Sequence, residues 1–171
     1  MEKILVSACL MGRRVRYDGG AKTSSDAWLA RWREEGRLVP FCPEVSGGLP
    51  VPRLAAEIEG GAGGAAVLSG AARVLATDGS DVTAEFVAGA QGALAVARAH
   101  GIRMAVLKEG SPSCGALSIY DGSFEGRRVA GQGVTTSLLE LNGIRVFDEA
   151  RLPEAAEHLR TVEAHSRTLE T

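Results

Sequence analysis

Three cysteines carry the most distinctive chemistry in this chain. Cys9, Cys42 and Cys114 are its only cysteines, and an odd number in the reducing compartment we expect for this chain disfavours a disulfide framework. One isolated cysteine is commonly just a small buried hydrophobic side chain. Three cysteines that meet in space would instead offer thiolate ligands to a soft metal. The elements that carry the cysteines decide between these two roles.

Each cysteine follows a short apolar segment that is typical of a buried strand. The segments and their cysteines are residues 3–7 with Cys9, residues 37–41 with Cys42, and residues 102–107 with Cys114. A fourth strand is expected at residues 144–147. Capping residues and apolar spacing predict helices between and after these strands. The expected helices cover residues 24–36, 83–100, 135–141 and 153–169.

Strands that alternate with helices predict an α/β fold, with a mostly parallel, Rossmann-like sheet and flanking crossover helices. Ligands of such sheets bind outside the carboxyl ends of the strands, where all three cysteines lie. The cysteines therefore converge if their strands are neighbours. A small inserted hairpin is expected from residues 65–68 and 73–76. The glycine-rich residues 46–64 and the polar segment around Tyr120 are expected to be loops.

Convergent thiolates leave the identity of the metal open. Zinc with three cysteines and an open position is one possibility, but the closely spaced cysteine pairs of most zinc sites are missing. An iron–sulfur cluster is the better fit. Its usual complement is four thiolates, so three protein ligands would leave one iron without a protein ligand and free to act as a Lewis acid.

The composition narrows the functional classes. The 171 residues, 45% hydrophobic and 23% charged, are expected to form one domain, residues 1–171. A net charge of -2 and only 5% aromatic residues disfavour general nucleic-acid binding. We identify no secretory signal or membrane span, so we expect a cytoplasmic protein without a membrane partner. The sequence does not indicate an oligomeric state.

The sequence resembles the thiouracil desulfidase family, formerly a domain of unknown function. The matching blocks are Val6–Gly12, Arg16–Gly19, Phe41–Pro50, Pro52–Arg53, Lys108–Gly115 and Ile119–Gly122. The resemblance extends from about Val6 to Phe147, and the Cys-Pro-Glu and Ser-Pro-Ser-Cys-Gly blocks are specific. Some relatives carry an appended second domain, which this sequence lacks, so it looks like the short, single-domain form.

The resemblance implies a 4Fe-4S cluster held by Cys9, Cys42 and Cys114, with one iron not ligated by protein. It also implies a non-redox desulfuration, in which water replaces the sulfur of a thiocarbonyl heterocycle and sulfide is released, as from thiouracil to uracil. The implied partner is a small thiolated base or nucleoside. A non-catalytic iron–sulfur or zinc protein that senses redox state or sulfide is the alternative.

Four neighbouring residues are candidates for the chemistry. Glu44, next to the proline after Cys42, could take a proton from the attacking water, although many loop glutamates are merely solvated. Ser111 and Ser113 could orient water or bind ring heteroatoms, but serine beside proline is also ordinary turn chemistry. Lys108 could stabilise negative charge, or could simply pair with Glu109.

The remaining motifs are expected to be ordinary surface features. Arg13, Arg16 and Arg53 could contact a sugar-phosphate group, but loop arginines are usually solvated. The three histidines, His100, His158 and His165, are not expected to be ligands. No Gly-x-Gly-x-x-Gly follows the first strand, so a dinucleotide site is not supported.

Overall fold

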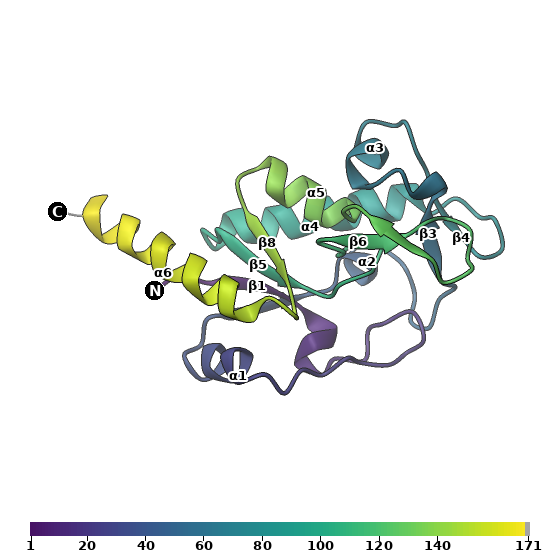
Figure 1. Ribbon diagram of the computed structural model, residues 1–171. Helices are drawn as coiled ribbons and strands as arrows, with labels where there is room; N and C mark the ends of the chain where they lie inside the picture. The colour runs from purple at the N-terminus through teal and green to yellow at the C-terminus, as the bar shows by residue number, and fades with distance from the viewer. Residues whose placement is uncertain (170–171) are drawn as a thin grey trace.

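The computed structural model describes residues 1–169 and confirms the expected α/β fold (Figure 1). Its centre is a four-stranded parallel sheet with strand order β2-β1-β5-β8. The strands are β1 (Ile4–Ser7), β2 (Leu38–Phe41), β5 (Met104–Leu107) and β8 (Arg145–Asp148). All four expected strands are therefore present. The three that precede the cysteines are neighbours, which the convergence of the cysteines requires.

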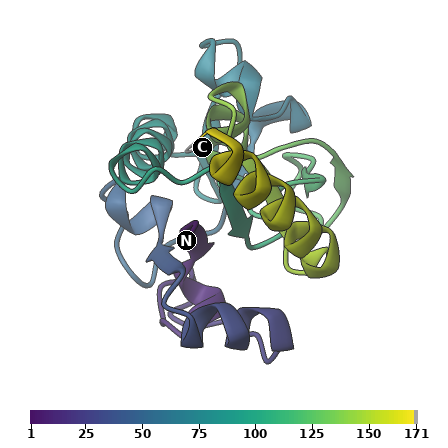
Figure 2. The same ribbon diagram turned by 90° about the vertical axis from the view of Figure 1, so that its left-hand side faces the viewer.

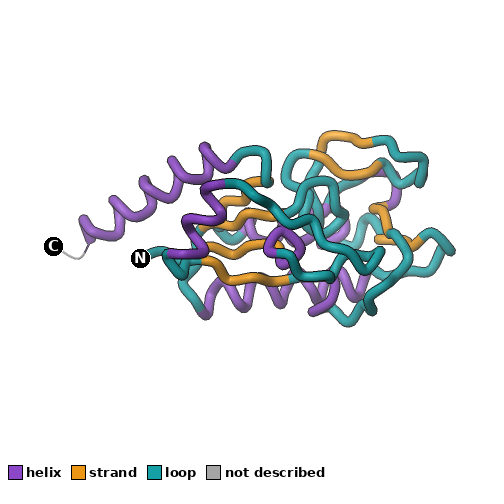
Figure 3. The backbone as a smooth tube through the Cα atoms, turned by 90° about the horizontal axis from the view of Figure 1, so that it is seen from below, coloured by secondary structure: helices purple, strands orange, loops and turns teal. Residues whose placement is uncertain are grey.

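The helices connect these strands and cover both faces of the sheet (Figures 2 and 3). They are α1 (Ala27–Glu34), α2 (Pro43–Ser46), α3 (Gly64–Leu68), α4 (Thr83–Ala99), α5 (Val134–Leu141) and α6 (Leu152–Leu169). The Asp26 carboxylate caps α1 by accepting a hydrogen bond of 2.7 Å from the Trp28 backbone N–H. None of the described helices is long and apolar enough to cross a membrane.

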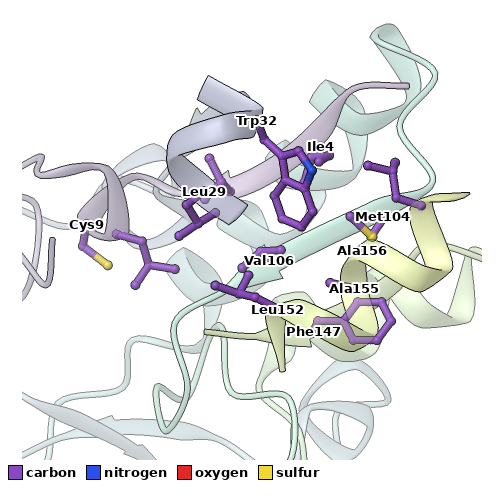
Figure 4. Close-up of a cluster of buried hydrophobic side chains, with 13 residues drawn as sticks. Ile4, Cys9, Leu29, Trp32, Met104, Val106, Phe147, Leu152, Ala155 and Ala156 are labelled. Atoms are coloured by element: carbon purple, nitrogen blue, oxygen red, sulfur yellow. The ribbon is translucent and has the colours of Figure 1, made fainter. Parts of the chain in front are cut away.

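Successive side chains of the buried strands point to opposite faces of the sheet, so they pack into two layers of core. Ile4 and Val6 of β1 pack with α1 and α6 on one face. Figure 4 shows Ile4 in this cluster with side chains of α1 and α6. Leu5 points to the other face and packs with α4 and α5. Central parallel strands that are buried on both faces have continuous apolar sequences, and for this reason β1 and β5 could be predicted from the sequence. Cys9 lies at one end of the first layer (Figure 4).

Two small antiparallel sheets extend the fold beyond the carboxyl edge, and they correct the expected loops. The first pairs β3 (Ala56–Ile58) with β4 (Val74–Ala76), and the second pairs β6 (Ser118–Tyr120) with β7 (Arg128–Ala130). Every residue of β7 is exposed, so this strand carries no hydrophobic pattern to detect. The glycine-rich residues 46–64 also contain β3 and a 3-10 turn, η2 (Glu59–Gly61).

The expected first strand of the inserted hairpin, residues 65–68, is wrong. These residues form α3, and the true partner of β4 is β3. A four-residue apolar run does not distinguish a strand from a short helix by periodicity. Packing decides here, because Gly64 lies so close to α5 that a Cβ atom would stand 2.2 Å from the Gly133 carbonyl oxygen.

Close glycine contacts fix α2, the short helix that follows Cys42, against α4. A Cβ atom on Gly47 would lie 2.0 Å from the Glu85 carbonyl oxygen, and one on Gly89 would lie 2.1 Å from that of Pro43. Both distances are far below van der Waals contact. The two helices therefore meet backbone to backbone, and this contact sets the position of the segment that carries Cys42.

We predict that Gly89→Ala destabilises the protein by about 1–3 kcal/mol, the usual cost of overpacking. Gly92→Ala, in the same helix, is the matched control. Its Cβ atom would meet only the ends of the Ser46 and Phe41 side chains, at 3.1 and 3.2 Å. Chemical denaturation of both variants provides the measurement. Equal stability of the two would show that the α2–α4 contact is not the constraint we describe.

Candidate active site

The carboxyl edge of the sheet holds one cavity of about 820 Å³ that is lined by all three cysteines. Cys9 and Cys42 follow the adjacent strands β1 and β2, and Cys114 lies in the loop after β5. Ser7, Arg53 and the candidate residues Glu44, Lys108 and Ser111 line the same cavity. The expected convergence of the cysteines is therefore confirmed.

Cys9 lies in a tight 3-10 turn, η1 (Ala8–Met11), directly after β1. The turn ends at Gly12, whose φ of 88° is a left-handed conformation that favours glycine. The Cys9 carbonyl oxygen accepts hydrogen bonds from the backbone N–H groups of Gly12, at 3.2 Å, and Lys22, at 3.0 Å. The end of the turn and the loop that follows it thus both hold the Cys9 backbone in place.

Cys42 occupies the N-cap position of α2. Its Sγ atom lies 4.0 Å from the Val15 carbonyl oxygen, so the loop after η1 borders this thiol. Pro43 begins α2, as proline often does, because its fixed φ suits the first helical position. Glu44 follows in the first turn. The order Cys-Pro-Glu therefore places a thiol and a carboxylate on the same cavity wall.

Side-chain hydrogen bonds shape the loop that carries Cys114. The Ser111 hydroxyl oxygen accepts from the backbone N–H groups of Ser113 and Cys114, at 3.0 and 3.2 Å. The Thr136 hydroxyl donates to the Cys114 carbonyl oxygen at 3.0 Å. Ser113 is fully buried, and its hydroxyl lies 2.8 Å from that of Thr135. Ser113 thus faces α5 and is absent from the cavity lining, whereas Ser111 belongs to that lining.

Sequence reasoning did not identify Glu109, which organises the same loop. Its Oε1 atom accepts hydrogen bonds from four backbone N–H groups, those of Gly110, Ala116, Leu117 and Ser118, at 3.0–3.3 Å. A carboxylate with this many amide donors fixes the backbone around it. The only sequence signal was its place beside Lys108 in the resemblance block.

Lys108 is held by acidic and carbonyl oxygens at the cavity wall. Its ammonium group forms an ion pair with Glu149 and donates to the Glu109 carbonyl oxygen at 3.2 Å. Its backbone N–H donates to the Ser7 hydroxyl oxygen at 2.9 Å. Lys108 thus lies beside the thiols, with two of its three ammonium donors bound by other oxygens.

Burial and mutual repulsion disfavour the ionised forms of the thiols. Burial raises the pKa of Cys9 to about 11, and the nearby Cys42 adds to this rise. Burial also raises the pKa of Cys42. It raises the pKa of Cys114 furthest, with additions from Glu44 and the other two thiols. Three thiolates in this place therefore require a strongly cationic group among them.

The donor set fits an iron–sulfur core, which binds thiolates and supplies that positive charge. Arg53 lines the same cavity. Its Nε atom, which is enclosed by protein atoms, is the only buried side-chain nitrogen or oxygen without a hydrogen-bond partner among the described residues. Within residues 1–169, no three His, Cys, Asp or Glu side chains are arranged to hold a single metal ion.

The clearest charged pair of the site joins Glu44 and Arg53. The Arg53 Nη2 atom donates to the Glu44 Oε2 atom at 2.8 Å. The Arg53 side chain is 5% exposed and that of Glu44 is 20% exposed. Arg53 is therefore not a solvated loop arginine, as the sequence led us to expect, but part of the cavity wall.

The other basic residues are placed differently. Arg16 lines the cavity and lies over the Tyr17 ring, with its guanidinium carbon 5.6 Å from the ring centroid. Arg13 is exposed and does not line the cavity. His100, His158 and His165 also lie outside the lining. His158 packs instead on Phe147, with ring centroids 5.7 Å apart.

Comparisons with known proteins show the family of this chain. The family model of 2-thiouracil desulfurase matches residues 4–151, so the chain belongs to that family. A solved structure described as the [4Fe-4S]-dependent thiouracil desulfidase TudS has 52% sequence identity and a TM-score of 0.86; the alignment covers 94% of this chain and 99% of TudS. The uncharacterized protein YbbK of Bacillus subtilis (strain 168) is 42% identical over 149 residues, which are 87% of this chain and 97% of YbbK.

Proposed function

We propose that this protein is an iron–sulfur desulfidase that hydrolyses the thiocarbonyl group of a thiouracil-like base and releases sulfide. The observation that supports this function most directly is the convergence of three thiols, two of them buried, and one carboxylate on a single cavity. The family and the cofactor named for TudS agree with it. The balanced reaction converts one C=S bond and one water into one C=O bond and hydrogen sulfide, so no carbon is oxidised or reduced.

Cys9, Cys42 and Cys114 would hold the 4Fe-4S cluster as thiolates, and the chain has no fourth cysteine to complete the set. When bound, the cluster supplies an iron without a protein ligand, a Lewis acid suited to thiocarbonyl sulfur. The protein contributes a buried site whose three ligands come from three separate loops. Glu109 and Ser111 accept hydrogen bonds from backbone N–H groups of the loop that carries Cys114.

Glu44 is the candidate general base. Its carboxylate lines the cavity two residues after Cys42 and is partly exposed, so a water molecule can reach it. In this role it would take a proton from the water that attacks the ring carbon, and would later deliver a proton to a leaving atom. Ser111 is a secondary candidate, because its hydroxyl lies at the cavity wall. Lys108 could still stabilise developing charge, although Glu149 binds its ammonium group.

The cavity can accommodate a substrate larger than a free pyrimidine base. Its lining combines apolar groups such as Phe41 and Leu54 with the polar groups of Arg16, Tyr17 and Tyr120, a mixture typical of small-molecule sites. The substrate class we propose is a thiolated pyrimidine base or nucleoside. A panel of thiolated bases, nucleosides and nucleotides, assayed for sulfide release, would rank them.

We predict that the anaerobically reconstituted protein binds about four irons and four sulfides per chain. Replacing any one of the three cysteines with serine should lower the iron content at least severalfold, because no spare thiol can substitute. Iron and sulfide assays with visible absorbance provide the measurement. Ser69→Ala, at an exposed position outside the cavity lining, is the control. Stoichiometric zinc without iron would contradict the proposal.

We predict that turnover needs water but no electron donor, because the net reaction changes no oxidation state. Thiouracil incubated anaerobically in oxygen-18 water, without reductant, should give uracil that carries the label, together with one sulfide per product. Mass spectrometry and a sulfide assay measure both. Unlabelled product, or repeated turnover that depends on NADPH or ATP, would show that the mechanism is not hydrolytic.

We predict that Glu44→Gln keeps the cluster and its absorbance but slows desulfuration by about a hundredfold or more, the scale of a lost general base. Glu59→Gln is the matched control, because Glu59 also forms an ion pair with an arginine, Arg73, but at the surface. Steady-state kinetics and iron analysis separate the two effects. Near-normal kcat in Glu44→Gln would reject the assigned role, and loss of iron would assign Glu44 to structure instead.

A further inference from the structure

Arg53 is bound on several sides in a way that fixes its guanidinium group. Besides Glu44, its Nη2 atom contacts the Val15 carbonyl oxygen at 3.0 Å, and its Nη1 atom contacts that of Pro50 at 3.1 Å. Its backbone N–H donates to the Tyr17 carbonyl oxygen at 2.7 Å. Three separate points of the surrounding loops therefore determine where this cation lies.

The Val15 carbonyl oxygen links Arg53 to the proposed ligand Cys42. This oxygen lies 3.0 Å from the Arg53 Nη2 atom and 4.0 Å from the Cys42 Sγ atom. The same Nη2 atom holds the Glu44 carboxylate at 2.8 Å. The thiol, the carbonyl, the guanidinium and the carboxylate thus form one connected group along the cavity wall.

An arginine that only stabilised the fold would be expected at the surface, or buried with all its donors satisfied. Burying an ion pair costs desolvation energy that its attraction often fails to recover. The surface pair of Arg73 and Glu59, with side chains 57% and 43% exposed, avoids that cost. Arg53 is buried and still has an Nε atom without a partner. Arg53 nevertheless lines the reaction cavity, where Glu44 and two carbonyl oxygens fix its guanidinium group.

We propose that Arg53 is the positioning residue of Glu44, holding its carboxylate at the Cys42 side of the cavity where it can act on water. This inference rests on the proposed function, because Glu44 acts on water only if the protein is a desulfidase. A direct role in binding a distant anionic group is less favoured, since both terminal nitrogens of Arg53 are already engaged. Only the planar fork of arginine can reach Glu44 and the two carbonyl oxygens together.

The test uses the reconstituted holoenzyme with thiouracil and two substitutions. Arg53→Met removes the charge and the fork, and Arg53→Lys keeps the charge but loses the fork. We expect Arg53→Met to lower kcat by about a hundredfold and Arg53→Lys by about tenfold, with KM changed less than about threefold. Iron content should remain near that of the unaltered protein. Arg73→Met is the matched control and should leave kcat unchanged.

A double-mutant comparison separates positioning from a general structural effect. If Arg53 acts through Glu44, Arg53→Lys should slow the unaltered protein but should not slow Glu44→Gln further. The same tenfold loss in both backgrounds would overturn the proposal, as would a loss confined to KM. Normal kcat in Arg53→Lys and in Arg53→Met would also overturn it.

Crystals of the protein without its cluster provide a measurement that does not depend on activity. In Arg53→Met, the Glu44 carboxylate should leave the position it occupies beside Arg53, whereas in Arg73→Met it should not move. An unmoved carboxylate in Arg53→Met would overturn the positioning role. Normal turnover in Glu44→Gln would instead reject the general base, and the crystals would still report whether Arg53 holds this side chain.

Discussion

The meeting of three thiols at one edge of a parallel sheet is the constraint on which the rest of the structure depends. Cys9 and Cys114 are buried and Cys42 is partly buried; burial raises the pKa of all three thiols, and Cys42 further raises the pKa of the other two. Such a group can become three thiolates only around a strong positive charge. The fold places Cys9, Cys42 and Cys114 there because β2, β1 and β5 are adjacent and parallel, so their carboxyl ends meet.

Rigid contacts hold these three loops at fixed positions relative to one another. Backbone contact between Gly89 and Pro43 fixes the helix after Cys42, and the amide-binding carboxylate of Glu109 fixes the loop of Cys114. A 3-10 turn fixes Cys9. Cluster ligands have to be held in place before the metal binds, because every disordered ligand adds an entropic cost to binding. The enrichment in glycine that the sequence shows has, at Gly89, this specific physical reason.

The sequence was sufficient to predict the central sheet, the main helices and the meeting of the cysteines. Buried parallel strands such as β1 leave a clear apolar signal, and the rule that ligands bind at the carboxyl edge then locates the site. The small sheets were not predictable in the same way. The exposed strand β7 has no alternating pattern, and the four-residue run at 65–68 suits a short helix equally well.

Interactions between residues distant in sequence were the hardest to foresee within the site. Arg53 looked like a solvated loop residue, yet it is buried against Glu44, nine residues away. Ser113 was a candidate for the chemistry, but its hydroxyl faces Thr135 of α5. Sequence position gives the neighbourhood of a side chain, whereas its direction depends on packing that only the fold defines. The charged pair at the cavity wall therefore emerged from the structure alone.

The most direct test of this account is Mössbauer spectroscopy of protein reconstituted with iron-57, recorded with and without thiouracil under anaerobic conditions. Three cysteines without a fourth predict a 4Fe-4S cluster in which one iron differs from the other three and alone changes its parameters when thiouracil is added. Four equivalent irons that do not respond to thiouracil would contradict the account, as would the absence of a four-iron cluster.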